Sequence, residues 1–151
     1  DGVHTVEDLR AEYQKMLYQN NLNTAVMDYL LANSTFKDLP KEVTDYQVNQ
    51  CLNYYYTMAQ YYGYDLDSFL QAAAGYNSAD DLLDAMSDSI TEYAREALLY
   101  QAVAEAMDIA PTQEQIDTYS AYTETYGANY CTMVALMDAV SEALTTGAQV
   151  K

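Results

Sequence analysis

Apolar residues recur every three or four positions almost throughout this chain, and no segment shows the alternating pattern of a strand. Only five glycines and two prolines interrupt the pattern. The sequence therefore predicts an all-α fold. Its 151 residues suffice for one ordinary domain with a sizeable core. We expect a single helical domain over residues 1–151.

Capping residues, prolines and glycines divide the chain into six predicted helices. They run from Thr5 to about Asn33, from after Pro40 to before Gly63, from about Asp65 to Ala74, from Ser78 to about Asp108, from Thr112 to Tyr126, and from about Asn129 to Thr145. The first and fourth have about 30 residues, and therefore a length of roughly 45 Å. A compact chain of this size is only about 40 Å across. We therefore expect an elongated multi-helix domain with helical-hairpin arms and clefts between them.

The charge balance is strongly acidic, with 23 Asp or Glu against six Lys or Arg and a net charge of -17. This balance disfavours nucleic acids and anionic membrane surfaces as partners, since both require clustered basic residues. No stretch is apolar enough to insert in a membrane. The balance favours neutral or basic partners. Asp80, Asp84, Asp88 and Glu92 form an acidic stripe, which is either a solvated face or a weak site for a cation or a basic peptide.

The residues for catalysis are scarce. His4 is the only histidine and lies at the start of the chain, so Ser-His and Cys-His nucleophile systems lack a base. No phosphate-binding loop or zinc-protease motif occurs. Cys51 and Cys131 are either two buried small side chains or one disulfide, and they do not form a metal motif. We expect neither an enzyme nor a bound cofactor or metal.

Six tyrosines lie between Tyr54 and Tyr64 on the second predicted helix. One stripe has the spacing of an ordinary core face and comprises Val48, Leu52, Tyr55, Ala59 and Tyr62. A second, adjoining stripe comprises Cys51, Tyr54, Met58 and Tyr61. It either packs against a second neighbouring helix or faces an open cleft and binds another protein. Tyr and Met suit the second role, because they give adaptable contact area that remains compatible with water.

A second group of tyrosines lies late in the chain. Tyr119, Tyr122, Tyr126 and Tyr130 step by three or four residues, and Met133 and Met137 continue the series. This group is either a core seam or a further binding surface.

Several segments, in their order along the chain, resemble the C-terminal domain of bacterial trigger factor, a ribosome-associated chaperone. They are "HTVEDLRAEYQKML", "LPKEVTDYQVNQCL", "YYGYDLDSFLQAAAGYNSADDLLDAM", "AREALLYQAVAEAMDIAPTQEQI" and "ETYGANYCTMVALMDAVSEALTTGAQ". The resemblance covers nearly the whole chain. The periplasmic chaperone SurA has a related helical fold.

This resemblance implies a two-armed helical domain that binds unfolded or nascent chains without ATP, through shallow apolar patches. The expected client contacts are Tyr54, Met58, Tyr61, Tyr119, Tyr122 and Met133. The alternative is an extracellular or cell-surface domain that recognises one folded partner.

The ribosome-binding and prolyl-isomerase domains of the family are absent from this sequence, so we expect no isomerase activity, although a parent protein could carry these domains upstream. The family's helical linker is also absent, which leaves a surface that a homodimer could cover. The chain is poor in Lys and rich in Tyr, Asn, Thr and Ser. This composition predicts an exported protein of a Gram-positive bacterium, with the cytoplasm as the alternative.

Overall fold

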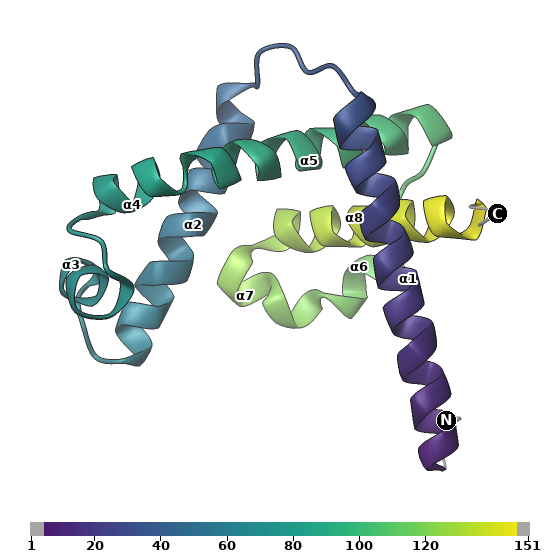
Figure 1. Cartoon of the computed structure of the whole chain (residues 1–151), viewed down its shortest axis with the longest axis horizontal. Helices are drawn as coiled ribbons and strands as arrows, with labels where there is room; N and C mark the ends of the chain where they lie inside the picture. Colours follow the sequence, from purple (N-terminus) through teal and green to yellow (C-terminus); the bar gives the residue numbers. More distant parts are fainter. Residues whose placement is uncertain (1–4, 148–151) are drawn as a thin grey trace. The chain divides into compact units, whose positions relative to one another are not determined.

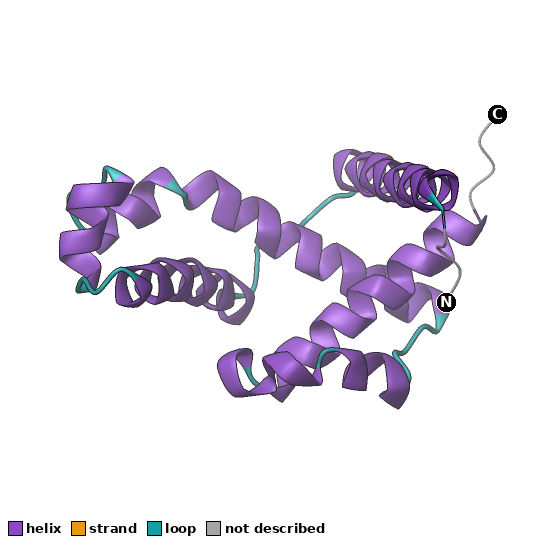
Figure 2. Ribbon diagram, turned by 90° about the horizontal axis from the view of Figure 1, so that it is seen from below, coloured by secondary structure: helices purple, strands orange, loops and turns teal. Residues whose placement is uncertain are grey.

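The computed structural model describes residues 5–147, so His4 lies outside the described residues. The predicted all-α fold is confirmed, because residues 5–147 form only helices and the loops between them (Figures 1 and 2). The elements are α1 (Val6–Asn33), α2 (Lys41–Tyr61), α3 (Leu66–Phe69), a π-helical turn η1 (Leu70–Ala74), α4 (Ala79–Ala85), α5 (Ser87–Met107), α6 (Gln113–Thr118), a 3-10 turn η2 (Ser120–Tyr122), α7 (Thr123–Tyr126) and α8 (Ala128–Gly147).

The predicted helix starts are confirmed by their caps. The backbone N–H of Asp8 donates to Oγ1 of Thr5 at 3.1 Å, and the N–H of Thr5 donates to the Asp8 carboxylate at 2.9 Å. Thr112 and Gln115 form a second capping box of the same kind. Ser78 caps α4 through its hydroxyl. Each cap satisfies N–H groups that the first helical turn cannot bond internally.

The chain divides into two compact units. Among the described residues, the first unit comprises 5–34 and 99–147. In it α1 crosses α8, and α6 and α7 pack on α8 (Figure 1). Its buried core side chains are Met27, Leu99, Tyr100, Ala104, Cys131, Ala135 and Val140.

The second unit comprises residues 35–98, where α2 packs against α3 and α4. Its buried core side chains are Ala59, Leu70, Leu82, Ile90 and Ala94. Gly75 ends η1 with φ of +80°, a left-handed conformation that glycine adopts without steric cost. The guanidinium of Arg95 lies 5.9 Å from the centre of the Phe36 ring, a cation–π contact that joins α5 to the loop before α2.

Two predicted helices are interrupted. The helix predicted from Ser78 to Asp108 divides at Met86, whose φ and ψ are -95° and 2°. Hydrogen bonds from Met86 N–H to Leu82 C=O and from Ile90 N–H to Met86 C=O continue across the break. The result is a bend, not a loop. The sequence gives no signal for it, because neither proline nor glycine occurs there.

The helix predicted from Thr112 to Tyr126 divides into α6, η2 and α7. At Tyr119 the backbone leaves the helical region, with φ of -97° and ψ of 7°. Its carbonyl accepts a hydrogen bond from the N–H of Tyr122 at 2.9 Å and another from the Cys131 thiol at 3.2 Å. These two bonds stabilise a tight turn where the pattern of apolar residues predicts a continuous helix.

Candidate functional site

The outer face of α2 carries three of the predicted contact residues. Tyr54 and Tyr61 have 59% and 81% of their surface exposed, and Met58 between them is half-buried. Their three- and four-residue spacing places them on one helix face. The Tyr54 ring meets Tyr55 edge-on, with centroids 5.3 Å apart. We call Tyr54, Met58 and Tyr61 the α2 surface.

The neighbouring stripe of α2 is only partly core. Ala59 is buried, Val48, Leu52 and Tyr55 are half-buried, and Tyr62 is 61% exposed. Tyr62 follows the last helical residue, and its ring stacks on Phe69 at 6.0 Å between centroids and 11° between planes. The assignment of Tyr62 to the core is therefore wrong. Because α2 ends at Tyr61, the helical spacing no longer fixes the direction of this side chain.

Four tyrosines gather in the first unit, as the spacing of the late group indicated. Ring centroids in the series Tyr119, Tyr122, Tyr126 and Tyr130 lie 4.7 to 6.5 Å apart. Tyr122 and Tyr126 are exposed, whereas Tyr119 and Tyr130 are half-buried. We call these four residues the tyrosine cluster. Met133, the sixth predicted contact, is half-buried on α8.

One member of the tyrosine cluster is anchored by charge. The Tyr119 hydroxyl donates a hydrogen bond to the carboxylate of Asp138 on α8, and this bond raises the pKa of Tyr119 to about 12. Desolvation adds to the shift. Deprotonated Tyr119 would lose the bond and face the carboxylate as a like charge. At neutral pH the Tyr119 hydroxyl is protonated, and its hydrogen bond to Asp138 holds the Tyr119 ring against α8.

Both cysteines are free thiols in this structure, and the disulfide that was one of two alternatives for Cys51 and Cys131 is not formed in it. Cys51 is half-buried on α2, and burial raises the pKa of its thiol. Cys131 is buried and donates to the carbonyl of Tyr119. Cys131 thus has a structural role in the first unit, where it holds the turn that presents the tyrosine cluster.

A further apolar surface lies on the first half of α1. Five side chains there are exposed by 40–71%: Val6, Leu9, Tyr13, Met16 and Leu17. Figure 1 shows this half of α1 beyond its crossing with α8. The sequence predicts that these residues share one helix face, since Leu9, Tyr13, Met16 and Leu17 follow helical spacing. It does not show whether another part of the chain covers that face. We call these five residues the α1 stripe.

The acidic stripe faces solvent along its whole length. Asp80, Asp84, Asp88 and Glu92 are all exposed. Between residues 5 and 147, no three His, Cys, Asp or Glu side chains are grouped so as to hold a metal ion. In the same range, no helix is both long enough and apolar enough to cross a membrane.

Comparison with known proteins identifies the family. The model of the bacterial trigger factor protein C-terminus matches residues 5–144, which is nearly the whole chain. The chain belongs to the trigger factor C-terminus family. Trigger factors of Streptococcus pyogenes serotype M5 (strain Manfredo) and serotype M1 are each 25% identical to it over 124 residues, which cover 78% of this chain and 29% of theirs. The trigger factor of serotype M4 (strain MGAS10750) is equally similar, with 27% of its length covered. No solved structure matches.

Two conclusions follow from the trigger factor match. The predicted resemblance is confirmed, and with it a place in a chaperone family. The predicted export is wrong, because trigger factors are cytoplasmic, ribosome-associated chaperones. Low Lys content changes surface charge and solubility but does not address a protein to a compartment, so composition misled here. The chain spans under a third of the length of these relatives.

Proposed function

We propose that this chain holds unfolded or nascent polypeptides, without ATP, on the α2 surface and on the tyrosine cluster with Met133. The observation that carries the proposal is the exposure of aromatic rings in a member of a chaperone family: Tyr54, Tyr61 and Tyr122 are 59%, 81% and 50% exposed. Each ring offers a large contact area and loses little side-chain entropy when a client covers it.

The proposed binding is weak at each surface and tolerant of sequence. The rings are accessible without any opening of the core, and half-buried Met58 and Met133 can adapt their side chains to different contacts. A client that is bound at one surface stays close to the others, so its further contacts are intramolecular. The total affinity therefore exceeds the affinity of any single surface. The chain acts in this proposal as one helical chaperone-type domain that binds and does not catalyse.

Aggregation of a denatured client tests the proposal. A guanidinium-unfolded model protein, diluted into buffer, should scatter less light when the purified chain is present in several-fold molar excess, with or without ATP. Bovine serum albumin at equal mass serves as the control for crowding. Undiminished scattering would contradict the proposed function. Tight binding of a single folded protein in a panel of clients would support the alternative of one dedicated partner.

We further propose that two copies associate weakly through the α1 stripe. Val6, Leu9, Tyr13 and Met16 alternate steps of three and four residues, the spacing of a coiled-coil seam. Residues 5–22 carry two basic and three acidic side chains, so this segment is nearly neutral in a chain of net charge -17. Two copies can therefore meet here with less repulsion than elsewhere on the chain.

Sedimentation equilibrium measures this association. The average mass should rise between roughly 5 and 500 µM protein and should rise further in high salt, which screens the net charge. Tyr13→Glu should abolish the rise, whereas Tyr29→Glu should not, because Tyr29 is exposed on another face of the same helix. A monomer at every concentration, or equal effects of the two variants, would overturn the proposal.

A further inference from the structure

The tyrosine cluster lies in a stretch of the chain that has acidic but no basic side chains. Between Arg95 and Lys151 the sequence contains no Lys, Arg or His. The same stretch contains seven acidic residues: Glu105, Asp108, Glu114, Asp117, Glu124, Asp138 and Glu142. The helices and turns that carry the cluster, from α6 to α8, therefore bring only negative side-chain charge to it.

Two exposed carboxylates lie beside the cluster along the chain. Asp117 is two residues before Tyr119, and Glu124 lies between Tyr122 and Tyr126 in α7. Asp117 accepts a hydrogen bond from the uncharged side chain of Gln113 at 2.8 Å, which leaves its charge in place. A separation of two residues keeps each carboxylate within about one Debye length of the rings, roughly 10 Å at 0.1 M salt.

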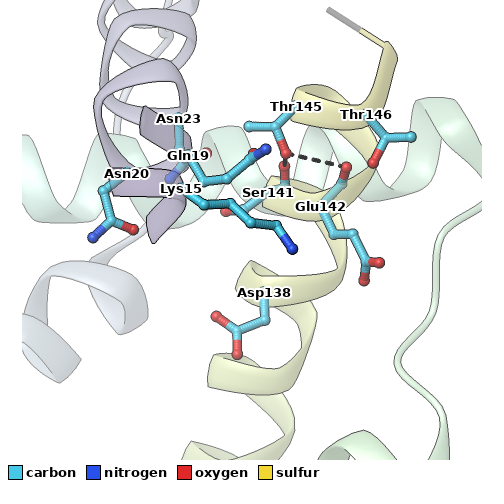
Figure 3. A pocket seen from close by; sticks show the side chains of 9 residues that line it. All are labelled: Lys15, Gln19, Asn20, Asn23, Asp138, Ser141, Glu142, Thr145 and Thr146. Atoms are coloured by element: carbon cyan, nitrogen blue, oxygen red, sulfur yellow. Dashed lines mark hydrogen bonds between the residues drawn. The ribbon is translucent and has the colours of Figure 1, made fainter. Parts of the chain in front are cut away.

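A third carboxylate, Asp138, accepts the Tyr119 hydroxyl but has a basic neighbour. Asp138, Glu142 and Lys15 line one pocket of about 440 Å³ in the first unit. Figure 3 shows Lys15 extending from α1 towards the face of α8 that carries Asp138. Lys15 therefore offsets part of the charge on α8, and Asp117 and Glu124 are the stronger source of negative potential at the cluster.

The exposed rings of the cluster can themselves attract a cation. Tyr122 and Tyr126 are 50% and 40% exposed, and their ring centroids lie 6.3 Å apart. The face of an aromatic ring is electron-rich and attracts an ammonium or guanidinium group within about 6 Å of its centroid. A basic client side chain at this place therefore gains from the rings and from the carboxylates, whereas an apolar side chain gains from the rings alone.

The α2 surface differs in this respect. No charged residue occurs between Asp45 and Asp65, so Tyr54 and Met58 lie in an uncharged segment. Asp65, the acidic residue nearest in sequence to Tyr61, caps α3 and accepts from both the N–H and the hydroxyl of Ser68. The α2 surface therefore offers contact area with little local charge.

We propose that the tyrosine cluster binds the Arg and Lys side chains of an unfolded client, whereas the α2 surface binds apolar side chains with little regard to charge. The inference rests on the proposed function and assigns a different selectivity to each of its two surfaces. Asp117 and Glu124 determine the selectivity of the cluster, and the rings of Tyr122 and Tyr126 provide the contact.

Paired peptides with and without positive charge test the proposal. The two probes have equal length, contain Leu and Ser, carry an uncharged dansyl label, and hold either arginine or citrulline at the same three positions. Citrulline has nearly the shape of arginine but no charge. In about 50 mM salt the wild-type chain should bind the arginine peptide about tenfold more tightly, as measured by fluorescence anisotropy. In about 500 mM salt this preference should fall to about twofold, because screening removes the attraction to the carboxylates and leaves the contact with the rings.

Variants at the cluster separate the carboxylates from the rings. Asp117→Asn combined with Glu124→Gln should lower the preference in low salt to about threefold or less and leave the affinity for the citrulline peptide unchanged. Tyr122→Leu combined with Tyr126→Leu should remove the preference that remains in high salt. The salt series on the wild type needs no variant, so it tests the proposal even if a variant fails to fold.

Two control variants locate the effect. Asp84→Asn combined with Glu92→Gln removes the same two charges from a net charge of -17, but at exposed positions on the acidic stripe of the second unit. This control should keep the tenfold preference. Tyr54→Ser combined with Tyr61→Ser, on the α2 surface, should weaken the binding of both peptides by the same factor.

The outcomes separate this inference from the proposed function. Equal losses in the two charge variants would mean that net charge selects the client and not the cluster, which overturns the inference. Equal affinity of the wild type for the two peptides overturns it as well, while suppressed client aggregation would leave the proposed function intact. Failure to bind either peptide, together with unchanged client aggregation, would overturn both.

Discussion

Leu82→Ala is expected to lower the free energy of unfolding by about 2–5 kcal/mol, the usual cost of a large cavity in a closed core. Leu82 lies in α4 with none of its surface exposed. Ala59 and Leu70 are buried in the same unit, and fully packed surroundings collapse only partly around a missing side chain. The measurement is urea unfolding followed by far-ultraviolet circular dichroism, with wild type and variant compared at one temperature.

Leu9→Ala is the matched control for this prediction. Leu9 is 59% exposed on the α1 stripe, so its truncation should change the free energy of unfolding by no more than about 0.5 kcal/mol. The control is measured at low protein concentration, where the proposed association through α1 does not contribute. A cost at Leu9 comparable with that at Leu82 would mean that the first half of α1 is packed, contrary to the structure.

The caps and chain breaks were predictable because they are local. Thr5, Ser78 and Thr112 act through groups three residues away, so their roles can be inferred from spacing alone. The bend at Met86 and the turn at Tyr119 were missed. The Tyr119 turn depends on Cys131, twelve residues later, whose thiol reaches the carbonyl only after α8 has packed.

The candidate surfaces were predictable in part. Helical spacing correctly grouped Tyr54, Met58 and Tyr61, but spacing describes which residues share a face and not what covers it. The same pattern gives buried Met27 and exposed Tyr13 on one helix, because the rest of the first unit covers only part of α1. The pocket that α1 and α8 line together, with Lys15 on one helix and Glu142 on the other, has no sequence signature, since it depends on the packing of two helices far apart in the sequence.

Tyr54→Ser combined with Tyr61→Ser is expected to weaken client binding about thirtyfold. A ring that loses about 50 Å² of exposed surface to a client contributes roughly 1 kcal/mol, and two rings contribute roughly 2 kcal/mol. Both side chains are exposed, at 59% and 81%, so the double variant should unfold at nearly the same urea concentration as the wild type. Fluorescence anisotropy of a labelled, permanently unfolded client measures the affinity.

Tyr18→Ser combined with Tyr29→Ser is the matched control, because it also removes two exposed tyrosines, at 52% and 67%, from a different helix. The control should retain wild-type affinity if position on the α2 surface matters. Equal losses in both double variants would mean that tyrosine content, and not the α2 surface, determines affinity. Full affinity in the variant with Tyr54→Ser and Tyr61→Ser would contradict a role for the α2 surface and would leave the tyrosine cluster as the client surface. In that case Tyr122→Ser should lower the affinity for the client.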